Sequence, residues 1–463
     1  MYTSFLELCG FTPNEIRKEL PRVKKAFGIL KIEPEDVKLA EKRIQEIFDI
    51  NLEGIRKILS IWIKELLALV LAKEEKKKIV YAIMPSPAES YTAAMLASED
   101  LYVGYPDYVL QMTMGALFNK LDPILEAGEK MGMGPGGAHC GLNKTRLGAH
   151  ALGIISRGDL SLAWGIACDE GPKTDELIHE IFGMPVQYIN RSQDSDLKEF
   201  PRINPRALEY LTGEIRRAYK RFGEVAGVKV TPDLVMKAIK LRTEFLENYN
   251  LISEIMRTDP IPLSQADFLL FHMITSVCIR DNQGAIDAVR ILYNELKQRV
   301  EKGIGVVKKG APRVLWGNHT PLADPGITRM VEDMGLAAPV SEIHYLISRI
   351  PTKVFDDPIK TVANRFFEMG ITTSVTGRIS DIINICKDWN LDGVFWFNHF
   401  PCRLIGTDAM MIKKAVKDQL DIPMLILEGE MYDTRIYNAQ QMRTRVETFA
   451  QMLKMTKATK GKE

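Results

Sequence analysis

The sequence predicts an α/β fold with two parallel-sheet lobes, an N-terminal helical region and a helical spacer. In two separate stretches of the chain, short β-rich runs alternate with helical segments, a pattern typical of parallel sheets covered by helices on both faces. Before the first stretch and between the two, apolar residues recur at helical spacing. The 463 residues also exceed what one hydrophobic core usually organises.

The expected parts are an N-terminal helical region, a first α/β lobe, a helical spacer, and a second α/β lobe with a C-terminal helix, over residues 1–75, 76–200, 201–310 and 311–463. Each lobe is expected to be Rossmann/flavodoxin-like. In the first lobe we predict strands at Ile79–Ile83, Leu101–Tyr105, Leu160–Ile166 and Val186–Ile189. In the second lobe we predict strands at Arg313–Gly317, Thr372–Val375, Val394–Phe397 and Met424–Leu427.

The composition is that of an ordinary globular protein, with 46% hydrophobic and 26% charged residues. The formal net charge of +1 gives no sign of a nucleic-acid partner or of attraction to an anionic membrane. The most apolar stretch, Ile58–Ala72, is interrupted by Lys64 and Glu65 and is too short for a membrane span. No signal peptide is evident at the N-terminus, so we expect a cytoplasmic protein with reduced thiols.

Three of the six cysteines follow predicted strands or a glycine-rich turn. Cys168 comes after the strand at Leu160–Ile166, and Cys402 comes after the strand at Val394–Phe397. Cys140 follows the glycine-rich turn at Gly132–Gly137. Ligand sites of open α/β sheets lie beyond the carboxyl ends of the strands. Two packed lobes are therefore expected to bring these three thiols together.

The other cysteines are Cys9, Cys278 and Cys386, which we interpret as core packing because free cysteine is among the most often buried residues. Three converging thiolates suit an iron–sulfur cluster. Such a cluster usually has four cysteine ligands, so three would leave one iron without a protein thiolate and open to water or a substrate oxygen. Zinc is the competing interpretation, although no C-x₂₋₄-C pair is present. Three chemically idle thiols are an equally weighted alternative.

The glycine-rich turn, Gly132–Gly137, satisfies G-x-G-x-x-G, but a helical segment precedes it and Pro135 lies inside it. A dinucleotide fingerprint requires a strand at that place. We therefore favour a turn that lets backbone approach something bulky. The chain contains no G-x-x-x-x-G-K-[ST] motif, so ATP hydrolysis by a P-loop is not expected.

Three histidines lie beside the candidate loops. His139 adjoins Cys140, His399 precedes Cys402 by three residues, and His319 follows the strand at Arg313–Gly317. Each is a candidate to donate a proton or to hydrogen-bond a cluster sulfide. For any one of them, an ordinary loop histidine is the commoner alternative.

An acidic cluster begins at Glu428, directly after the last predicted strand. A carboxylate at a strand terminus can orient a substrate or act as an acid or base, and Glu428 is our candidate for this role. The alternative is an ion pair that holds the turn, either Asp433–Arg435 or Glu428–Arg443.

Four parts of the chain carry a resemblance to a known family, namely His139–Gly148, Ala167–Asp169 with Lys173 and Glu176, Asp392–His399 with Cys402 and Arg403, and Pro423–Phe449. They resemble the 2-hydroxyacyl-CoA dehydratase D-component family, which also contains subunits of ATP-dependent benzoyl-CoA reductase. The resemblance extends from about residue 76 onward, and the three-cysteine arrangement is its specific part.

The resemblance implies a heterodimer with a second homologous subunit, in which each subunit holds a cluster, typically [4Fe-4S], through three cysteines. Here these are Cys140, Cys168 and Cys402. It also implies that an ATP-hydrolysing iron–sulfur activator protein supplies one low-potential electron. In dehydratases the acyl-CoA thioester becomes a ketyl radical that expels the hydroxyl group. Gly136 and Gly137 are then expected to let backbone approach the cluster or the CoA tail.

In the reductase branch of the family, two electrons and protons dearomatise a benzoyl ring instead. The sequence around His139 and Cys140 does not assign the chain to either branch. A subunit whose cluster only relays electrons is a further alternative.

Overall fold

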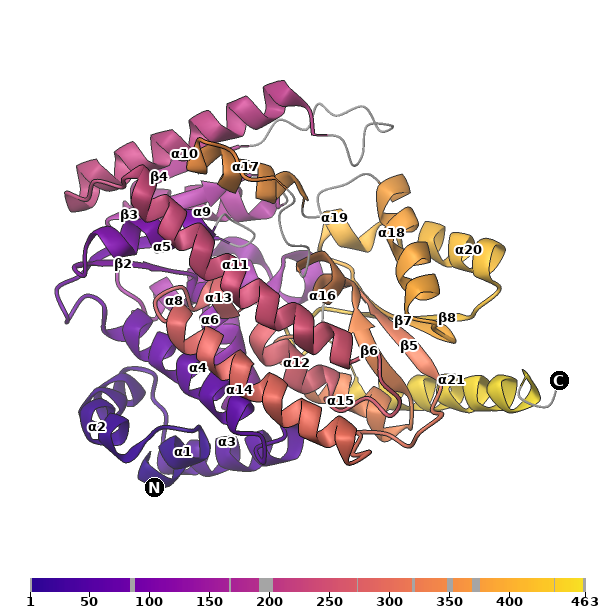
Figure 1. Ribbon diagram of the computed structural model, residues 1–463. Helices are drawn as coiled ribbons and strands as arrows, with labels where there is room; N and C mark the ends of the chain where they lie inside the picture. The colour runs from indigo at the N-terminus through magenta and orange to yellow at the C-terminus, as the bar shows by residue number, and fades with distance from the viewer. Residues whose placement is uncertain are drawn as a thin grey trace.

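The computed structural model describes residues 2–83, 88–165, 168–190, 203–272, 274–318, 321–347, 353–368, 375–436 and 438–460. Within them, two four-stranded parallel sheets are each flanked by helices, as the sequence predicts (Figure 1). In the view of Figure 1 the first sheet lies at the left and the second at the right.

The first sheet has the strand order β2-β1-β3-β4, with every neighbouring pair parallel. Its strands are β1 (Lys78–Ala82), β2 (Leu101–Gly104), β3 (Leu160–Trp164) and β4 (Val186–Ile189). The strands β1, β2 and β3 are buried almost throughout, which explains why they read as continuous apolar runs. The helices of this part are α5 (Ala88–Ala97), α6 (Pro106–Leu110), η1 (Gln111–Leu117), α7 (Asp122–Gly128), η2 (Glu129–Met133), η3 (Gly136–Ala138), α8 (Gly141–Ala151) and α9 (Glu170–Phe182).

The second sheet repeats this topology, with the order β6-β5-β7-β8 and parallel neighbours. Its strands are β5 (Arg313–Gly317), β6 (Ala337–Ser341), β7 (Gly393–His399) and β8 (Met424–Gly429). Its helices are α15 (Gly326–Asp333), α16 (Glu342–Ile347), α18 (Val375–Asp388), α19 (Arg403–Gly406), α20 (Ala409–Leu420) and α21 (Ala439–Lys460). Helix α17 (Pro358–Glu368) belongs to the same part of the sequence but packs on α5, beside the first sheet (Figure 1). Both orders are the flavodoxin-like 2-1-3-4, in which the strand order reverses between the first and third strands.

The second sheet differs from our expectation at two places. Strand β6 was not expected from the sequence. Of the strand expected at Thr372–Val375, residues 372–374 lie outside the described residues, and Val375 begins helix α18.

Before the first sheet, four helices pack together: α1 (Tyr2–Leu8), α2 (Pro13–Ile29), α3 (Pro34–Ile47) and α4 (Glu53–Leu71). Helix α2 begins with Thr12 and Glu15 in a capping box, and Pro34 occupies the first turn of α3. Helix α4 is the apolar stretch noted in the sequence, and nearly all its side chains are buried in the protein core. Among the described helices, none combines the length and the apolarity that a bilayer crossing demands.

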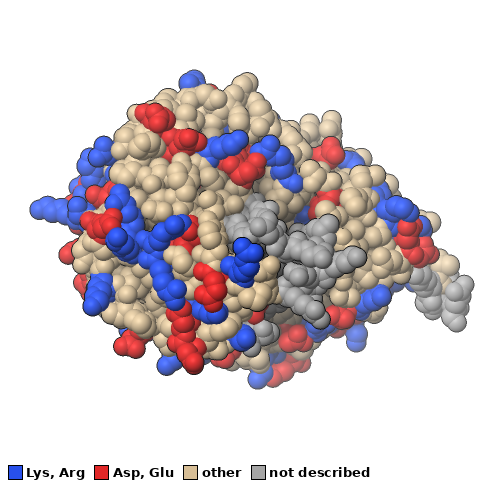
Figure 2. Space-filling model, turned by 90° about the horizontal axis from the view of Figure 1, so that it is seen from above, with Lys and Arg blue, Asp and Glu red and all other residues tan. Residues whose placement is uncertain are grey.

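Between the sheets the chain forms α10 (Pro205–Ala226), α11 (Pro232–Ile255), α12 (Gln265–His272), α13 (Ile274–Val277) and α14 (Asn282–Glu301). Helix α14 packs on α4 and α11, and α11 also packs on α5 (Figure 1). Helix α17 packs on α10 and α11, although it follows β6 in the chain. On the face shown in Figure 2, acidic and basic side chains are interspersed, in keeping with the net charge of +1.

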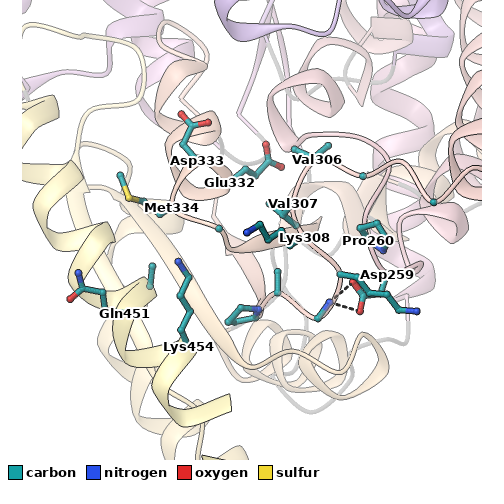
Figure 3. A pocket seen from close by; sticks show the side chains of 18 of the residues that line it. Asp259, Pro260, Val306, Val307, Lys308, Glu332, Asp333, Met334, Gln451 and Lys454 are labelled. Carbon is teal, nitrogen blue, oxygen red and sulfur yellow. Dashed lines mark hydrogen bonds between the residues drawn. The ribbon is translucent and has the colours of Figure 1, made fainter. Parts of the chain in front are cut away.

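A groove of about 1210 Å³ lies at the amino ends of β5 and β6, between residues 303–312 and helix α21 (Figure 3). The Asp259 carboxylate accepts hydrogen bonds from the Gly310 N–H at 2.9 and 3.0 Å in its wall. Ligands of such sheets bind at the opposite, carboxyl ends of the strands. The groove is therefore not the place where the candidate cysteines meet.

The buried Glu332 in this groove makes stability depend on pH. Burial raises its pKa to about 8, although the Gln265 N–H and Arg329 oppose the shift; Asp267 and Asp333 add to it. The folded state binds this proton more tightly than the unfolded chain does. The contribution of the bound proton to the free energy of unfolding is therefore present at pH 4 and is lost as the pH rises through 8. We expect Glu332→Gln to raise the free energy of unfolding by about 1–3 kcal/mol at pH 9.

Urea titrations of both proteins at pH 5 and pH 9 measure this difference. Glutamine keeps an oxygen for the Gln265 N–H, so the two proteins should have nearly equal stability at pH 5. An equal difference at both pH values would contradict the role of this proton.

Candidate functional site

Each of the three candidate cysteines begins or directly precedes a helix at the edge of a sheet. Cys140 is the N-cap of α8, Cys402 is the N-cap of α19, and Cys168 lies two residues before α9. Cys168 and Cys402 follow the corresponding third strands, β3 and β7, which lie where the strand order of each sheet reverses. All three thiols are half-buried, whereas Cys9, Cys278 and Cys386 are buried in the hydrophobic core, as we expected.

The three thiols lie within electrostatic reach of one another. Burial raises the pKa of Cys140 well above its usual value, and Glu430, Cys168, Glu170 and Cys402 raise it further. Burial likewise raises the pKa of Cys168 to about 11, with a smaller contribution from Cys402. The folded chain thus brings together sulfurs that are 28 to 262 residues apart in the sequence. A cation that bound these sulfurs would displace their protons, because cysteine binds metal as the thiolate.

Backbone N–H groups point at two of the sulfurs. The Gly171 N–H donates to Cys168 Sγ at 3.2 Å. Burial also raises the pKa of Cys402, but hydrogen bonds from the Ile405 and Leu404 N–H groups oppose the shift. These donors stabilise sulfur in its anionic form, the form that binds metal.

His399, at the end of β7, faces Cys140 across the junction of the lobes. Its Nδ1 accepts a hydrogen bond from the Met431 N–H at 3.2 Å, so a neutral ring carries its proton on Nε2. That Nε2 lies 3.6 Å from Cys140 Sγ and 3.6 Å from Glu430 Oε1. His399 is therefore placed as a hydrogen-bond donor to the Cys140 sulfur.

Glu430 completes this group, in which one ligand atom each of Cys140, His399 and Glu430 lie within 4.8 Å of one another. Its carboxylate is fully buried and accepts hydrogen bonds from the Gly141 N–H at 3.0 Å and the Tyr432 N–H at 2.7 Å. Burial raises its pKa to about 8.

Glu428 was our candidate from this acidic cluster, but the structure places its side chain in solvent and Glu430 in the site. Strand β8 ends at Gly429, and the residue just beyond the carboxyl end is the one that turns inward. If the exact end of β8 had been known, Glu430 could have been identified from the sequence as the residue that enters the site. The ion-pair alternative is present as well, because Asp433 binds Arg435 through two hydrogen bonds at 2.6 and 2.8 Å.

The glycine-rich turn follows η2, a helical segment, and not a strand. A Cβ at Gly137 would lie 2.2 Å from the Phe400 ring, so the close approach at this turn is to the loop that carries Cys402. The turn is held from the other side by the buried Lys144, which binds the Gly136 carbonyl and, at 2.9 Å, Glu129.

A buried arginine orders the Cys402 side of the site. Arg378 donates to the Glu342 carboxylate at 2.6 and 2.8 Å and to Asp408 at 2.8 and 2.9 Å. It also donates to the Ile405 carbonyl at 3.3 Å, within the helix that Cys402 begins. Its charge is one of the factors that oppose the rise in the pKa of Cys402.

Residues 87–453 match the family model described as 2-hydroxyglutaryl-CoA dehydratase, D-component. The chain belongs to this family. The resemblance inferred from the sequence is thereby confirmed, and the match includes all three candidate cysteines, His399 and Glu430. Helices α1–α4 precede the matched segment.

Curated relatives carry the names of dehydratase subunits. The chain is 21% identical to lactoyl-CoA dehydratase subunit alpha of Anaerotignum propionicum over 54% of this chain and 60% of that one. It is 21% identical to the (R)-phenyllactyl-CoA dehydratase alpha subunit of Clostridium sporogenes, over 66% and 75%. It is 23% identical to (R)-2-hydroxyglutaryl-CoA dehydratase subunit alpha of Acidaminococcus fermentans, over 58% and 56%. The chain thus spans less than two thirds of two of these relatives.

Two further histidines, His139 and His319, were candidates for the site from the sequence. His319 lies outside the described residues. His139 is 41% exposed, and its Nδ1 lies 2.9 Å from Glu170 Oε1. Glu170, which was not a candidate from the sequence, accepts from the Cys140 backbone N–H at 3.2 and 3.3 Å.

Proposed function

We propose that this chain is the iron–sulfur subunit of a 2-hydroxyacyl-CoA dehydratase-type enzyme. The observation that carries the proposal is that Cys140 lies with His399 and Glu430 at the junction of the two lobes, within electrostatic reach of Cys168 and Cys402. Family membership and the names of the relatives support the reaction class.

The donor set fits an iron–sulfur cluster held by three thiolates. The three cysteines come from three loops, and N–H groups of Gly171, Leu404 and Ile405 point at two of the sulfurs. Hydrogen bonds to the sulfurs are one of the means by which proteins set cluster potentials. A [4Fe-4S] cluster in this place would supply one-electron transfer and an iron with an open coordination position.

The residues around the thiols have separable tasks. His399 donates from Nε2 toward the Cys140 sulfur, and Tyr432 packs edge-on against its ring at 5.1 Å. Glu430 ties the start of α8 to the end of β8 and so joins the two lobes at the site. Burial of these groups excludes water, which protects a radical and strengthens each electrostatic contact.

The substrate chemistry that we propose is elimination of water from a 2-hydroxyacyl-CoA. One low-potential electron converts the thioester carbonyl to a ketyl radical, the 2-hydroxyl group leaves, the β-proton is then removed, and the electron is returned. We propose that the electron comes from an ATP-hydrolysing iron–sulfur activator protein. The relatives are named as alpha subunits, which supports pairing with a second, homologous subunit.

The test is the number of electrons consumed per turnover by the anaerobically purified complex, supplied with activator, ATP and a 2-hydroxyacyl-CoA. Because the electron is recycled in dehydration, we expect far less than one electron per enoyl-CoA formed. Stoichiometric consumption would favour an aryl-CoA reductase subunit. A cluster whose irons all have protein ligands, with no room for substrate, would favour an electron-relay or scaffold subunit.

A further inference from the structure

The N-terminus of helix α8 is capped by carboxylates that come from other parts of the chain. Cys140 is the N-cap of this helix, and its side chain makes no cap hydrogen bond. The Cys140 N–H points at the Glu170 carboxylate, with N–O distances of 3.2 and 3.3 Å. The next N–H, that of Gly141, donates to Glu430 at 3.0 Å.

This arrangement resembles a capping box made by another helix. In a capping box, a glutamate at the third helical position of the same helix accepts from the N-cap N–H. In α8 that third position is Asn143. The acceptor is supplied instead by Glu170, the first residue of α9, which lies two residues after Cys168.

Glu170 is well placed to fix one candidate ligand relative to another. Its side chain is only 18% exposed, and Oε1 also lies 2.9 Å from His139 Nδ1. Its own helix starts beside Cys168, whose sulfur accepts from the Gly171 N–H. The short segment from Cys168 to Gly171 therefore carries one candidate ligand and contacts the loop of the other, Cys140.

We propose that Glu170 is a positioning residue that sets the distance between Cys140 and Cys168. This inference rests on the proposed function, since it assigns Glu170 a role toward the group that these cysteines hold. The carboxylate acts by holding the Cys140 backbone, and its negative charge lies close to the ligand sulfurs. Residues that hold metal ligands in place commonly change metal affinity by 10- to 100-fold when they are replaced.

The test compares Glu170→Ala, Glu170→Gln and Glu180→Gln as anaerobically reconstituted full-length chains. Glutamine keeps one oxygen that can accept from the Cys140 N–H, whereas alanine removes the acceptor. Glu180 is exposed on the same helix, so its replacement removes an equal charge away from Cys140. The measurements are iron per chain, the rate of iron release to a ferrous chelator, circular dichroism, and the reduction potential by EPR-monitored titration.

We expect Glu170→Ala to release iron about tenfold faster than wild type. Glu170→Gln should stay within about threefold, and Glu180→Gln should match wild type. The potential of Glu170→Gln should be more positive, because a negative charge beside the cluster has been removed. If Glu170→Ala does not fold, the reduction potential of Glu170→Gln tests the proposal instead.

Wild-type iron release in Glu170→Ala, or a wild-type potential in Glu170→Gln, would overturn the positioning role while leaving the proposed function intact. An equal defect in Glu180→Gln would overturn it too. A wild-type chain that takes up no iron would overturn both proposals.

Discussion

Replacement of Cys168 by alanine is expected to abolish stable iron binding, from about four irons per chain in the wild type to less than one. The Cys168 sulfur accepts a hydrogen bond from the Gly171 N–H and lies within electrostatic reach of Cys140 and Cys402. With it removed, two thiolates from two different lobes remain. Anaerobic purification followed by iron and sulfide quantification and EPR measures the loss.

The matched controls are Cys278→Ala and Cys386→Ala. Both cysteines are buried in the hydrophobic core, and Cys386 lies inside helix α18. We expect wild-type iron content in both variants, with at most a modest loss of stability from the smaller side chain. Full iron occupancy in Cys168→Ala would refute the assignment of the ligands.

Removal of the Arg378 side chain is expected to cause the largest loss of stability, about 3–5 kcal/mol for Arg378→Ala. The guanidinium pairs with the buried Glu342 and Asp408, and these carboxylates raise its pKa further above the usual value. It also lies over the Trp396 ring at 4.9 Å. Without it, two buried carboxylates lose their partner.

Urea denaturation of Arg378→Ala, Arg378→Lys and Lys387→Ala measures this effect. Lysine keeps the charge but not the planar fork that reaches both carboxylates, so an intermediate loss is expected. Lys387 is exposed on the same helix, and its replacement should cost less than about 0.5 kcal/mol. An unfolding midpoint for Arg378→Ala within error of wild type would contradict the account of this buried pair of carboxylates.

The same variant reports on the site, because Arg378 donates to the Ile405 carbonyl in the helix that follows Cys402. Faster iron release from Arg378→Lys than from Lys387→Ala would connect the buried ion pairs to the position of this cysteine. Equal release would confine Arg378 to a role in stability.

Of the eight strands in the described part of the chain, seven could be located from the sequence, because buried parallel strands are rich in β-branched and aromatic residues. The missed strand, β6, reads Ala337-Ala338-Pro339-Val340-Ser341. Alanine and proline are poor strand formers, and proline cannot donate a ladder hydrogen bond. The segment is a strand because it pairs with β5 at the edge of the sheet, where one side needs no donors.

The site residues divide in a similar way. Cys140, Cys168 and Cys402 could be chosen because each follows a strand or a turn at the start of a helix. Glu430 could have been chosen only if the exact end of β8 had been known. Glu170 could not be chosen, because its role depends on the Cys140 N–H group that faces it from 30 residues away.

By itself, the sequence determined the two-lobed α/β plan, the family, and the three thiols that stand at helix starts. These follow from local patterns, since apolar periodicity and strand ends are properties of short segments. Only the tertiary structure decided that Glu430 and not Glu428 enters the site, that His399 carries its proton toward Cys140, and that Glu170 caps a helix other than its own. The physical reason is that a side chain's hydrogen-bond partner is set by the packing of distant segments.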